Sequence, residues 1–285
     1  MLWIEQLFHI KKPIIAMLHL DPLPGDPRFR YGDSMAAVVA HAKADLAALQ
    51  DGGVDGILIS NEFSLPYQRH MNFVTPAAMA YVVGCLRGSI RVPFGVDCIS
   101  DGDATLELAA AVDADFVRGT FSGVYVGAGG LYNNDFSALL RRKAALHLDA
   151  LKMLYFINPE SDRNLDTRPL SEIARSTIFK AHPDGLCISA NAAGQDVDDA
   201  LIASVKQAAP EVAVLCNTGC RPDTIARKLS LGDAAVVGTY FKEGGKLENE
   251  RLENLRVDIQ RVREFMDVVY RLRAELEEYR KEANA

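Results

Sequence analysis

The sequence predicts a single (βα)8 barrel, a TIM barrel whose working face lies at the carboxyl ends of its strands. The chain has 285 residues, close to the roughly 250 of one such barrel. Short apolar segments rich in Val and Ile alternate with helical stretches, an order typical of a parallel sheet. No change in composition marks a second domain, so we expect one domain over residues 1–285.

Eight segments are predicted to be the strands. They are, in order, 13–20, 56–60, 92–97, 115–120, 152–157, 185–190, 212–217 and 234–239. The intervening segments carry apolar residues three and four positions apart, as in 36–49 and 201–208, which predicts helices. The alternative is an open doubly wound sheet. Its dinucleotide-binding form is disfavoured because no GxGxxG follows the first strand.

The N-terminal segment MLWIEQLFHIKK predicts a short helix that plugs the bottom of the barrel. Trp3, Leu7 and Phe8 lie on one helical face. The segment lacks the order and the cleavage site of a signal peptide. No apolar run is long enough to span a membrane, so we expect no membrane insertion.

The C-terminal segment predicts a long helix over about 250–283. Apolar residues recur at nearly heptad spacing from Leu252 to Tyr279, with Arg and Glu between them. The part beyond Arg271 is longer than a final barrel helix needs, so we expect a homo-oligomer. The alternative is a long helix folded back on its own barrel.

Composition limits the classes of partner. The net charge of −7 leaves no basic stripe for a nucleic acid. The five cysteines are odd in number and form no CxxC, a usage typical of reduced thiols in the cytoplasm. Cys216 and Cys220 are spaced like metal ligands, but no matching His or Cys cluster accompanies them. We therefore expect no metal site there.

The ends of the seventh and eighth predicted strands indicate a phosphate site. The seventh ends at Asn217-Thr218-Gly219 before a helix expected near 221–224, and the eighth ends at Gly238-Thr239. Barrels bind phosphate with these two loops, through main-chain N–H groups and a helix N-terminus. Lys242 would add a full positive charge. The alternative is that Gly219 and Gly238 only close tight turns.

Three acid–base candidates follow or end the first three predicted strands, namely His19, Glu62 and Asp97. We expect them to converge at the mouth of the barrel. Glu62 and Asp97 would divide acid and base roles or hold a divalent ion, and His19 would carry a proton. Arg118, at the end of the fourth strand, would keep a carboxylate ionised. The alternatives are a buried structural bridge to Arg118 and a core histidine.

Two loops stand out at the same end of the barrel. Residues 21–29 contain three prolines and are stiff, which suits either a pocket wall or a plain connector. Residues 119–135 are long for a βα loop and contain five glycines. Such a loop is typical of a lid or a binding loop, in which Tyr125, Leu131 and Tyr132 would cover a ligand. The alternative is a loop without a role.

Four segments resemble the BtpA family. They are KKPIIAMLHLDPLPGDPRF (11–29), GGVDGILISNEFSLPY (52–67), VPFGVD (92–97) and NTGCRPDTI (217–225). Two segments, SNEFSLPY (60–67) and HPDGLCISA (182–190), are closest to the SgcQ branch. The resemblance implies a barrel of the ribulose-phosphate-binding type. The family takes its name from a role in photosystem I biogenesis, whereas the SgcQ branch accompanies genes of sugar uptake and metabolism.

The chain departs from this family at three places. Asp97 stands where many relatives have Asn, and Ala128 lies where many carry an acidic residue. Residues 156–159 replace an end of the fifth strand that is often charged and contains His in the wider family. These differences indicate a substrate different from that of the photosystem-linked members.

Together the sequence predicts a cytoplasmic enzyme acting on a phosphorylated small molecule, a sugar phosphate. A lyase, an isomerase or a hydrolase would suit these residues. No cofactor is required by the sequence, although a divalent metal would fit the carboxylates. The alternative is a non-catalytic biogenesis, assembly or regulatory protein, because barrels host many functions.

Overall fold

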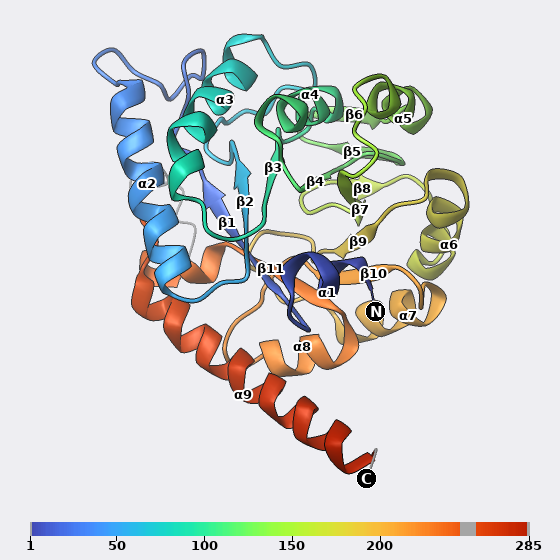
Figure 1. Ribbon diagram of the computed structural model, residues 1–285. Coiled ribbons are helices and arrows are strands. Elements are labelled where there is room, and N and C mark those ends of the chain that lie inside the picture. The colour runs from blue at the N-terminus through green and yellow to red at the C-terminus, as the bar shows by residue number, and fades with distance from the viewer. Residues whose placement is uncertain (1, 246–254, 284–285) are drawn as a thin grey trace.

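The computed structural model describes residues 2–245 and 255–283. Within them, eight parallel strands close into a barrel in the order β1-β11-β10-β9-β7-β4-β3-β2 (Figure 1). These strands are β1 (Ile14–His19), β2 (Gly56–Ser60), β3 (Phe94–Asp97), β4 (Phe116–Gly119), β7 (Lys152–Asn158), β9 (Gly185–Ile188), β10 (Ala213–Cys216) and β11 (Ala234–Val237). Each coincides with one of the eight predicted segments, so the predicted barrel is confirmed and the open sheet is excluded.

Helices surround the barrel on the outside (Figure 1). They are α1 (Trp3–Phe8), α2 (Met35–Asp51), α3 (Val74–Leu86), α4 (Gly102–Val112), α5 (Phe136–Ala145), α6 (Leu170–Ala181), α7 (Asp199–Ala208), α8 (Ile225–Leu231) and α9 (Ile259–Ala283). Five begin at a side-chain cap, in which an oxygen accepts a main-chain N–H of the first turn. The caps are Ser34, Asp101, Asp135, Asp198 and Asp258.

Two apolar cores hold this arrangement. The outer core lies between the strands and the helices, and the inner core fills the barrel itself. Helix α1 adds Ile4 and Phe8 to the inner core. The Phe8 ring packs edge-on against Phe116, and a Cβ at Gly56 would lie only 2.3 Å from Phe8 Cε1. Helix α1 therefore closes the amino-terminal end of the barrel, which we call the lower rim.

An aspartate pattern repeats four times around the lower rim. Asp55, Asp115, Asp184 and Asp233 each directly precede a strand, namely β2, β4, β9 and β11. Each donates its main-chain N–H to a carbonyl on the preceding barrel strand. Its carboxylate accepts the N–H of that same residue, at 2.7 to 2.9 Å. Alternate strands are therefore latched to their neighbours by reciprocal pairs.

The long loop after β4 is not an irregular segment. It forms the hairpin of β5 (Val124–Gly127) and β6 (Gly130–Asn133), and β8 (Arg163–Asn164) adds a third strand. Tyr125 is buried, whereas Leu131 is exposed. Of the three side chains expected to cover a ligand, only Tyr132 lines a cavity at the barrel mouth described below.

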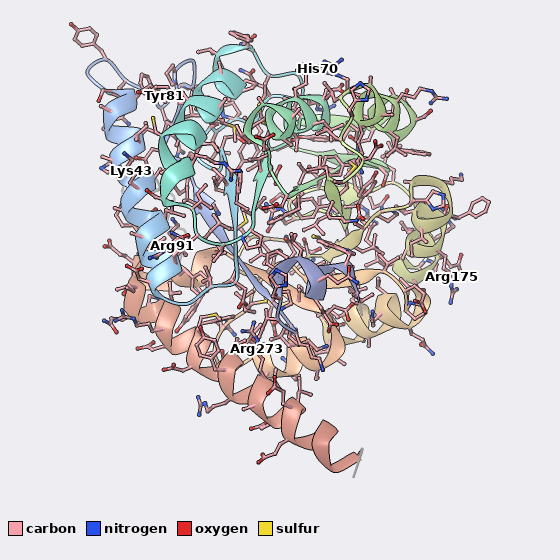
Figure 2. The ribbon with its side chains drawn as sticks, in the orientation of Figure 1. Lys43, His70, Tyr81, Arg91, Arg175 and Arg273 are labelled. Carbon is pink, nitrogen blue, oxygen red and sulfur yellow. The ribbon has the colours of Figure 1, made fainter. Side chains whose placement is uncertain are left out.

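The first half of α9 packs on the chain's own barrel. Val262, Phe265, Met266 and Val269 are fully buried there. Arg273, labelled in Figure 2, pairs with Asp55 and donates to the carbonyl of Lys12. The end of the helix extends past the body of the barrel (Figure 1). Two members of the predicted apolar stripe, Leu252 and the Tyr279 side chain, lie outside the described part.

No helix within the described ranges is both long enough and apolar enough to cross a membrane.

Candidate functional site

A cavity of about 510 Å³ opens at the carboxyl ends of the strands. We call it the cradle cavity. One side is formed by the loops that follow β9, β10 and β11, and its lining there includes Gly194, Gly219, Gly238, Thr239 and Arg221. Gly194 and Gly219 have positive φ, and a Cβ at Gly219 would lie 2.2 Å from the carbonyl oxygen of Gln195. At these glycines the wall has no side chain, which lets a ligand approach the main chain closely, and Arg221 adds a positive charge.

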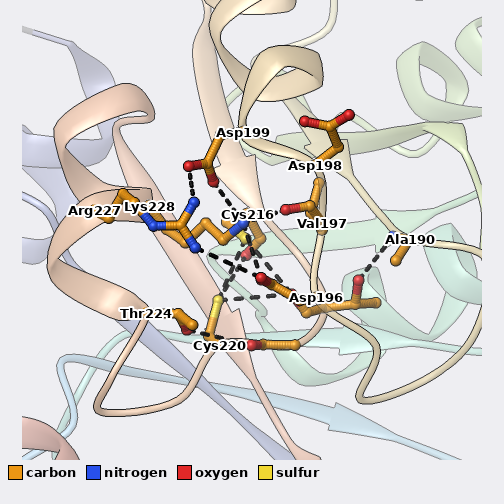
Figure 3. A network of polar contacts seen from close by, with 12 residues as sticks. Ala190, Asp196, Val197, Asp198, Asp199, Cys216, Cys220, Thr224, Arg227 and Lys228 are labelled. Atoms are coloured by element: carbon orange, nitrogen blue, oxygen red, sulfur yellow. Dashed lines mark hydrogen bonds and ion pairs between the residues drawn. The ribbon is translucent and has the colours of Figure 1, made fainter.

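A buried polar network holds these loops (Figure 3). The ammonium of Lys228 is fully buried, contacts Asp196 and Asp199 at 2.9 and 2.7 Å, and donates to the carbonyl of Val197. Below it, the Sγ atoms of Cys216 and Cys220 lie 3.3 Å apart in a hydrogen bond that lowers the pKa of Cys216. The ion pairs fix the loop after β9 against α8, and the thiol pair joins the end of β10 to the loop that follows it, so the cradle is preorganised.

The helix expected near residues 221–224 begins later. Helix α8 begins at Ile225 and has seven residues. The hydroxyl of Thr224 accepts the N–H of Arg221 at 3.0 Å, which makes a turn of the segment before the helix. The cradle wall at this point is that turn.

The structure corrects the position expected for Lys242. Its side chain is fully buried, and its ammonium contacts Asp45 of α2 at 3.2 Å. It is not among the residues that line the cradle cavity. The short helix Thr239–Phe241 turns the chain away from the mouth just before Lys242. The half-exposed Arg221 lines the cavity instead.

The opposite side of the cradle cavity carries charged and titratable side chains. His19, Glu62, Arg118 and Glu160 line it, and they come from the ends of β1, β2, β4 and β7. The structure thus brings His19, Glu62 and Arg118 together with Asn217, Gly219, Gly238 and Thr239 in one cavity.

Arg118 is the central cation of the site. Its Nε and Nη2 donate to Oδ2 of Asp97 at 3.1 and 3.0 Å, and its Nη1 donates to Oδ1 of Asn217 at 2.9 Å. Asn217 in turn donates to Oγ of Ser189 at 3.1 Å. The guanidinium therefore ties the ends of β3, β4 and β10 together across the mouth.

Asp97 is engaged by this guanidinium. Both side chains are buried, with 3% of Asp97 and 7% of Arg118 exposed. Burial raises the pKa of Asp97, and the charge and hydrogen bonds of Arg118 oppose that rise. The buried bridge that the sequence left open is thus present. It makes Asp97 a positioning residue for Arg118.

His19 and Glu62 face one another. The Nε2 of His19 lies 3.9 Å from Oε2 of Glu62. Burial lowers the pKa of His19 well below its usual value, and the charges of Lys242 and Arg118 lower it further. His19 is therefore neutral at pH 7, and this pair is a contact with a neutral imidazole. A Cβ at Gly238 would lie 3.1 Å from His19 Cε1, so the glycine makes room for the ring.

Glu160 also lines the cradle cavity, and the sequence had assigned it no role. Burial raises its pKa to about 7, Arg118 opposes the rise, and Glu62 and Asp97 add to it. The residue as a whole is partly exposed, yet its Oε2 is buried without a hydrogen-bond partner among the described residues. Its position two residues after β7 indicates a place at the mouth of the barrel, whereas its proximity to Glu62 cannot be inferred from the sequence.

Burial also raises the pKa of Glu62. The charges of Arg118 and Lys242 oppose this effect, and the charge of Asp97 adds to it. The mouth therefore holds two carboxyl groups with raised pKa values beside one guanidinium. Of the two, Glu160, with a pKa of about 7, exchanges a proton near neutral pH.

A second cavity, of about 450 Å³, adjoins the first. We call it the hairpin chamber, because Ala128, Gly129 and Tyr132 of the β5–β6 hairpin form one wall. Glu62, Arg118, Glu160 and Ala193 line both cavities. The remaining walls come from residues at or after the ends of β2, β3, β4, β7 and β9.

Within the described residues, no group of three or more His, Cys, Asp or Glu side chains is arranged to hold a metal ion.

Comparison with known proteins identifies the family. A family model described as the BtpA family matches residues 10–271. This chain belongs to the BtpA family. The sgc region protein SgcQ of Escherichia coli (strain K12) is 40% identical over 273 residues, which cover 96% of this chain and 100% of that protein. The photosystem I biogenesis protein BtpA of Synechocystis is 30% identical over 259 residues, 88% of each chain. The resemblance predicted from the motifs is confirmed.

Solved structures share the fold at low sequence identity. One described as "Native KDPGal structure" has a TM-score of 0.53 at 15% identity and covers 92% of this chain and 96% of that one. Phosphoribosyl anthranilate isomerase from Thermus thermophilus has a TM-score of 0.54 at 9% identity and covers 91% and 99%. This BtpA-family chain is therefore a TIM barrel with the architecture of known enzymes. Its own reaction has to be argued from its site.

Proposed function

We propose that this protein is an enzyme that binds a sugar phosphate in the cradle cavity and carries out acid–base chemistry on it. Lyase, isomerase and hydrolase reactions all require this chemistry. The phosphate lies against the glycine-rich loops after β9, β10 and β11, beside Arg221. The sugar extends toward Glu62 and Glu160.

One observation carries the proposal. A wall that contains three glycines and Arg221 faces two carboxyl groups with raised pKa values across a single cavity. A carboxyl group whose pKa is near 7 is both donor and acceptor at neutral pH, which is the condition for general acid–base catalysis. The buried Oε2 of Glu160 has no partner in the described structure, and a substrate atom would supply one.

We assign each polar residue of the cavity a distinct role. Glu160 is the proton donor and Glu62 the base. Neutral His19 is a hydrogen-bonding partner for the sugar or for Glu62. Asp97 holds Arg118, whose charge favours the ionised form of Glu62.

Binding is tested with glucose 6-phosphate and ribose 5-phosphate, each against its free sugar, by thermal shift and calorimetry. A ligand that binds only the native state raises the melting temperature. We expect the phosphates alone to raise it and Arg221→Gln to weaken binding. Arg142→Gln removes a comparably exposed arginine outside the cavity lining and is the control. Equal binding of free sugars, or an unaffected Arg221→Gln variant, would refute the anion site.

Turnover is followed by proton NMR of the same sugar phosphates, including exchange of substrate C–H with solvent deuterium. We expect Glu160→Gln to keep binding and to lower turnover by about 10²-fold or more, the size of a lost general acid. Glu107→Gln, on an exposed carboxylate, is the control. Tight binding with no reaction by the unmodified protein, on sugar phosphates and on their phosphorylated glycosides alike, would favour the non-catalytic assembly or regulatory role.

A further inference from the structure

We propose that the hairpin chamber binds the second, uncharged half of a two-part substrate whose phosphorylated half occupies the cradle cavity. The substrate class is a phosphorylated glycoside, in which the anomeric carbon of a sugar phosphate is joined through oxygen or nitrogen to a planar, largely apolar group. This inference rests on the proposed function and deepens it, because the cradle cavity must hold the phosphate.

The two cavities meet at one wall. Glu62, Arg118 and Glu160 line both of them. A ligand long enough to reach from the cradle cavity into the hairpin chamber must pass over these three side chains. The bond between its two halves would then lie beside both carboxyl groups.

The walls of the hairpin chamber disfavour a second anion and suit an apolar group. The carboxyl groups of Glu62, Asp97, Glu160 and Asp162 line it. Aromatic and aliphatic side chains form a large part of the remaining lining, and planar groups pack well on such surfaces. These side chains are Leu65, Pro66, Ile99, Tyr132, Phe156 and Pro159. Among the described residues that line it, the cations are limited to Arg118, which is already paired with Asp97. A second phosphate would have no charge to bind there.

The hairpin that closes the chamber is held in place. The guanidinium of Arg69 lies 3.9 Å from the centre of the Tyr132 ring and donates to the carbonyl of Gly129 at 2.6 Å. The Tyr132 hydroxyl and Oγ of Ser100 form a hydrogen bond of 3.0 Å. These contacts join the hairpin to the loops after β2 and β3. The ring of Tyr132 is thereby fixed as a wall, which lowers the entropic cost of binding.

The reaction that this arrangement supports is hydrolysis of the bond between the two halves. Glu160 donates its proton to the leaving oxygen or nitrogen as the bond to the anomeric carbon breaks. Glu62 takes a proton from the water whose oxygen bonds to that carbon. The products are the free sugar phosphate and the released planar group. A proton passing through solvent from Glu62 to Glu160 restores the starting state.

The test compares matched probes by calorimetry. One series is glucose 6-phosphate, 4-nitrophenyl glucoside 6-phosphate and unphosphorylated 4-nitrophenyl glucoside. The other is ribose 5-phosphate, adenosine 5′-monophosphate and adenosine. We expect the two-part phosphate of at least one series to bind about tenfold or more tightly than its sugar phosphate, equivalent to about 1.4 kcal/mol. Release of 4-nitrophenol or adenine reports cleavage.

Three variants test whether the preference for the two-part phosphate arises in the hairpin chamber, and a fourth tests cleavage. Tyr132→Ala removes the aromatic wall and should erase the tenfold preference, whereas Tyr132→Phe keeps the ring and should retain it. Ala128→Trp fills the chamber and should erase the preference without changing sugar phosphate affinity. Glu160→Gln should bind the two-part probe and fail to cleave it.

Two results would overturn the inference while leaving the proposed function intact. One is that sugar phosphates bind through Arg221 but two-part probes bind no better. The other is that the preference survives both Tyr132→Ala and Ala128→Trp. A protein that binds neither sugar phosphate would instead refute the proposed function itself.

Discussion

The two rims of this barrel are built by different rules. At the lower rim one device recurs four times, an aspartate that precedes alternate strands and pairs reciprocally with the strand before it. At the carboxyl-terminal end of the barrel, the upper rim, the strand ends carry no such repeated device. They supply a histidine, two glutamates, an aspartate, an arginine, an asparagine and glycines. The lower rim is periodic because its task, closing the barrel, is the same at each strand pair.

The upper rim is irregular, as the proposed function requires, because one asymmetric ligand would contact it from several sides. Its polar groups are partly unsatisfied, as the Oε2 of Glu160 and the Nδ1 of His19 show within the described structure. Buried groups without partners cost stability. We therefore expect substitutions at the lower rim to lower the stability of the folded protein, whereas some substitutions at the upper rim should raise it.

The largest effect is expected for Arg118→Met. It leaves Asp97 buried without its cation, and breaking a buried pair costs about 3 to 5 kcal/mol. The pKa of Asp97 would rise further. When a carboxyl group has a higher pKa in the folded state than in the unfolded state, the free energy of unfolding falls as pH rises. The destabilisation caused by Arg118→Met, measured by urea unfolding, should therefore be greater at pH 8 than at pH 5.

The double variant Asp97→Asn/Arg118→Met is the matched control. With neither charge present, most of the lost stability should return. A loss below about 1 kcal/mol in the single variant would show that the pair is solvated and is not the structural centre of the upper rim.

Glu160→Gln is expected to stabilise the protein. Burial raises the pKa of Glu160 to about 7, against a usual value near 4.3. The folded state therefore keeps a proton that the unfolded state has released, and stability falls as pH rises between these two values. The variant should gain on the order of 2 kcal/mol at pH 8.

The gain should disappear below about pH 4, where Glu160 is protonated in both states. Unfolding in urea across this pH range measures it, with the exposed Glu107→Gln as control. A constant difference at every pH would mean that the substitution acts through packing and not through the proton.

Asp115→Ala tests one lower-rim latch. The substitution leaves the N–H of Phe94 without the carboxylate that it contacts at 2.9 Å, and a loss of about 1 to 2 kcal/mol follows. Asp115→Asn keeps an acceptor and should lose less. The exposed Asp149→Ala should change stability by under about 0.5 kcal/mol. Equal effects of Asp115→Ala and Asp149→Ala would show that the repeated aspartates do not latch the strands.

The sequence predicted the barrel because its strands are local and strongly patterned. Each of the eight apolar runs became a strand, since alternating β and α segments leave few ways to bury their apolar faces. The hairpin after β4 was missed, although its signal is local as well. Two short segments flank Ala128-Gly129, which is the length of a two-residue hairpin turn. The glycines in this stretch favoured the interpretation as a mobile loop.

The site was predictable only in part, because its partners lie far apart in the chain. His19, Glu62 and Arg118 were found from their positions after strands. The burial of Lys242 against Asp45 joins residues 197 positions apart, and no local pattern announces it. For Asp97 the sequence left two interpretations, an acid–base role and a buried ion pair with Arg118. It could not decide between them, since the sequence indicates which strands are neighbours but not the direction of a side chain.

The smallest effect on stability is expected at the end of α9, where we also expect the association of two or more copies. Leu272 and Leu276 continue the stripe formed by the fully buried Val262, Phe265, Met266 and Val269, yet they are only half-buried. A second copy of the chain would cover them. Leu276→Gln should alter the stability of one copy by under about 0.5 kcal/mol, because the residue lies beyond the part of the helix that is packed on the barrel.

The same substitution should lower the mass in solution. Light scattering at micromolar concentration should give a multiple of 31.2 kDa for the unmodified protein and a smaller value for Leu276→Gln, with the exposed Glu277→Gln as control. A mass of 31.2 kDa for the unmodified protein would show that α9 serves its own barrel alone. Both rims would then be formed by a single copy of the chain, because neither the latches nor the cavity wall uses a residue beyond Arg273.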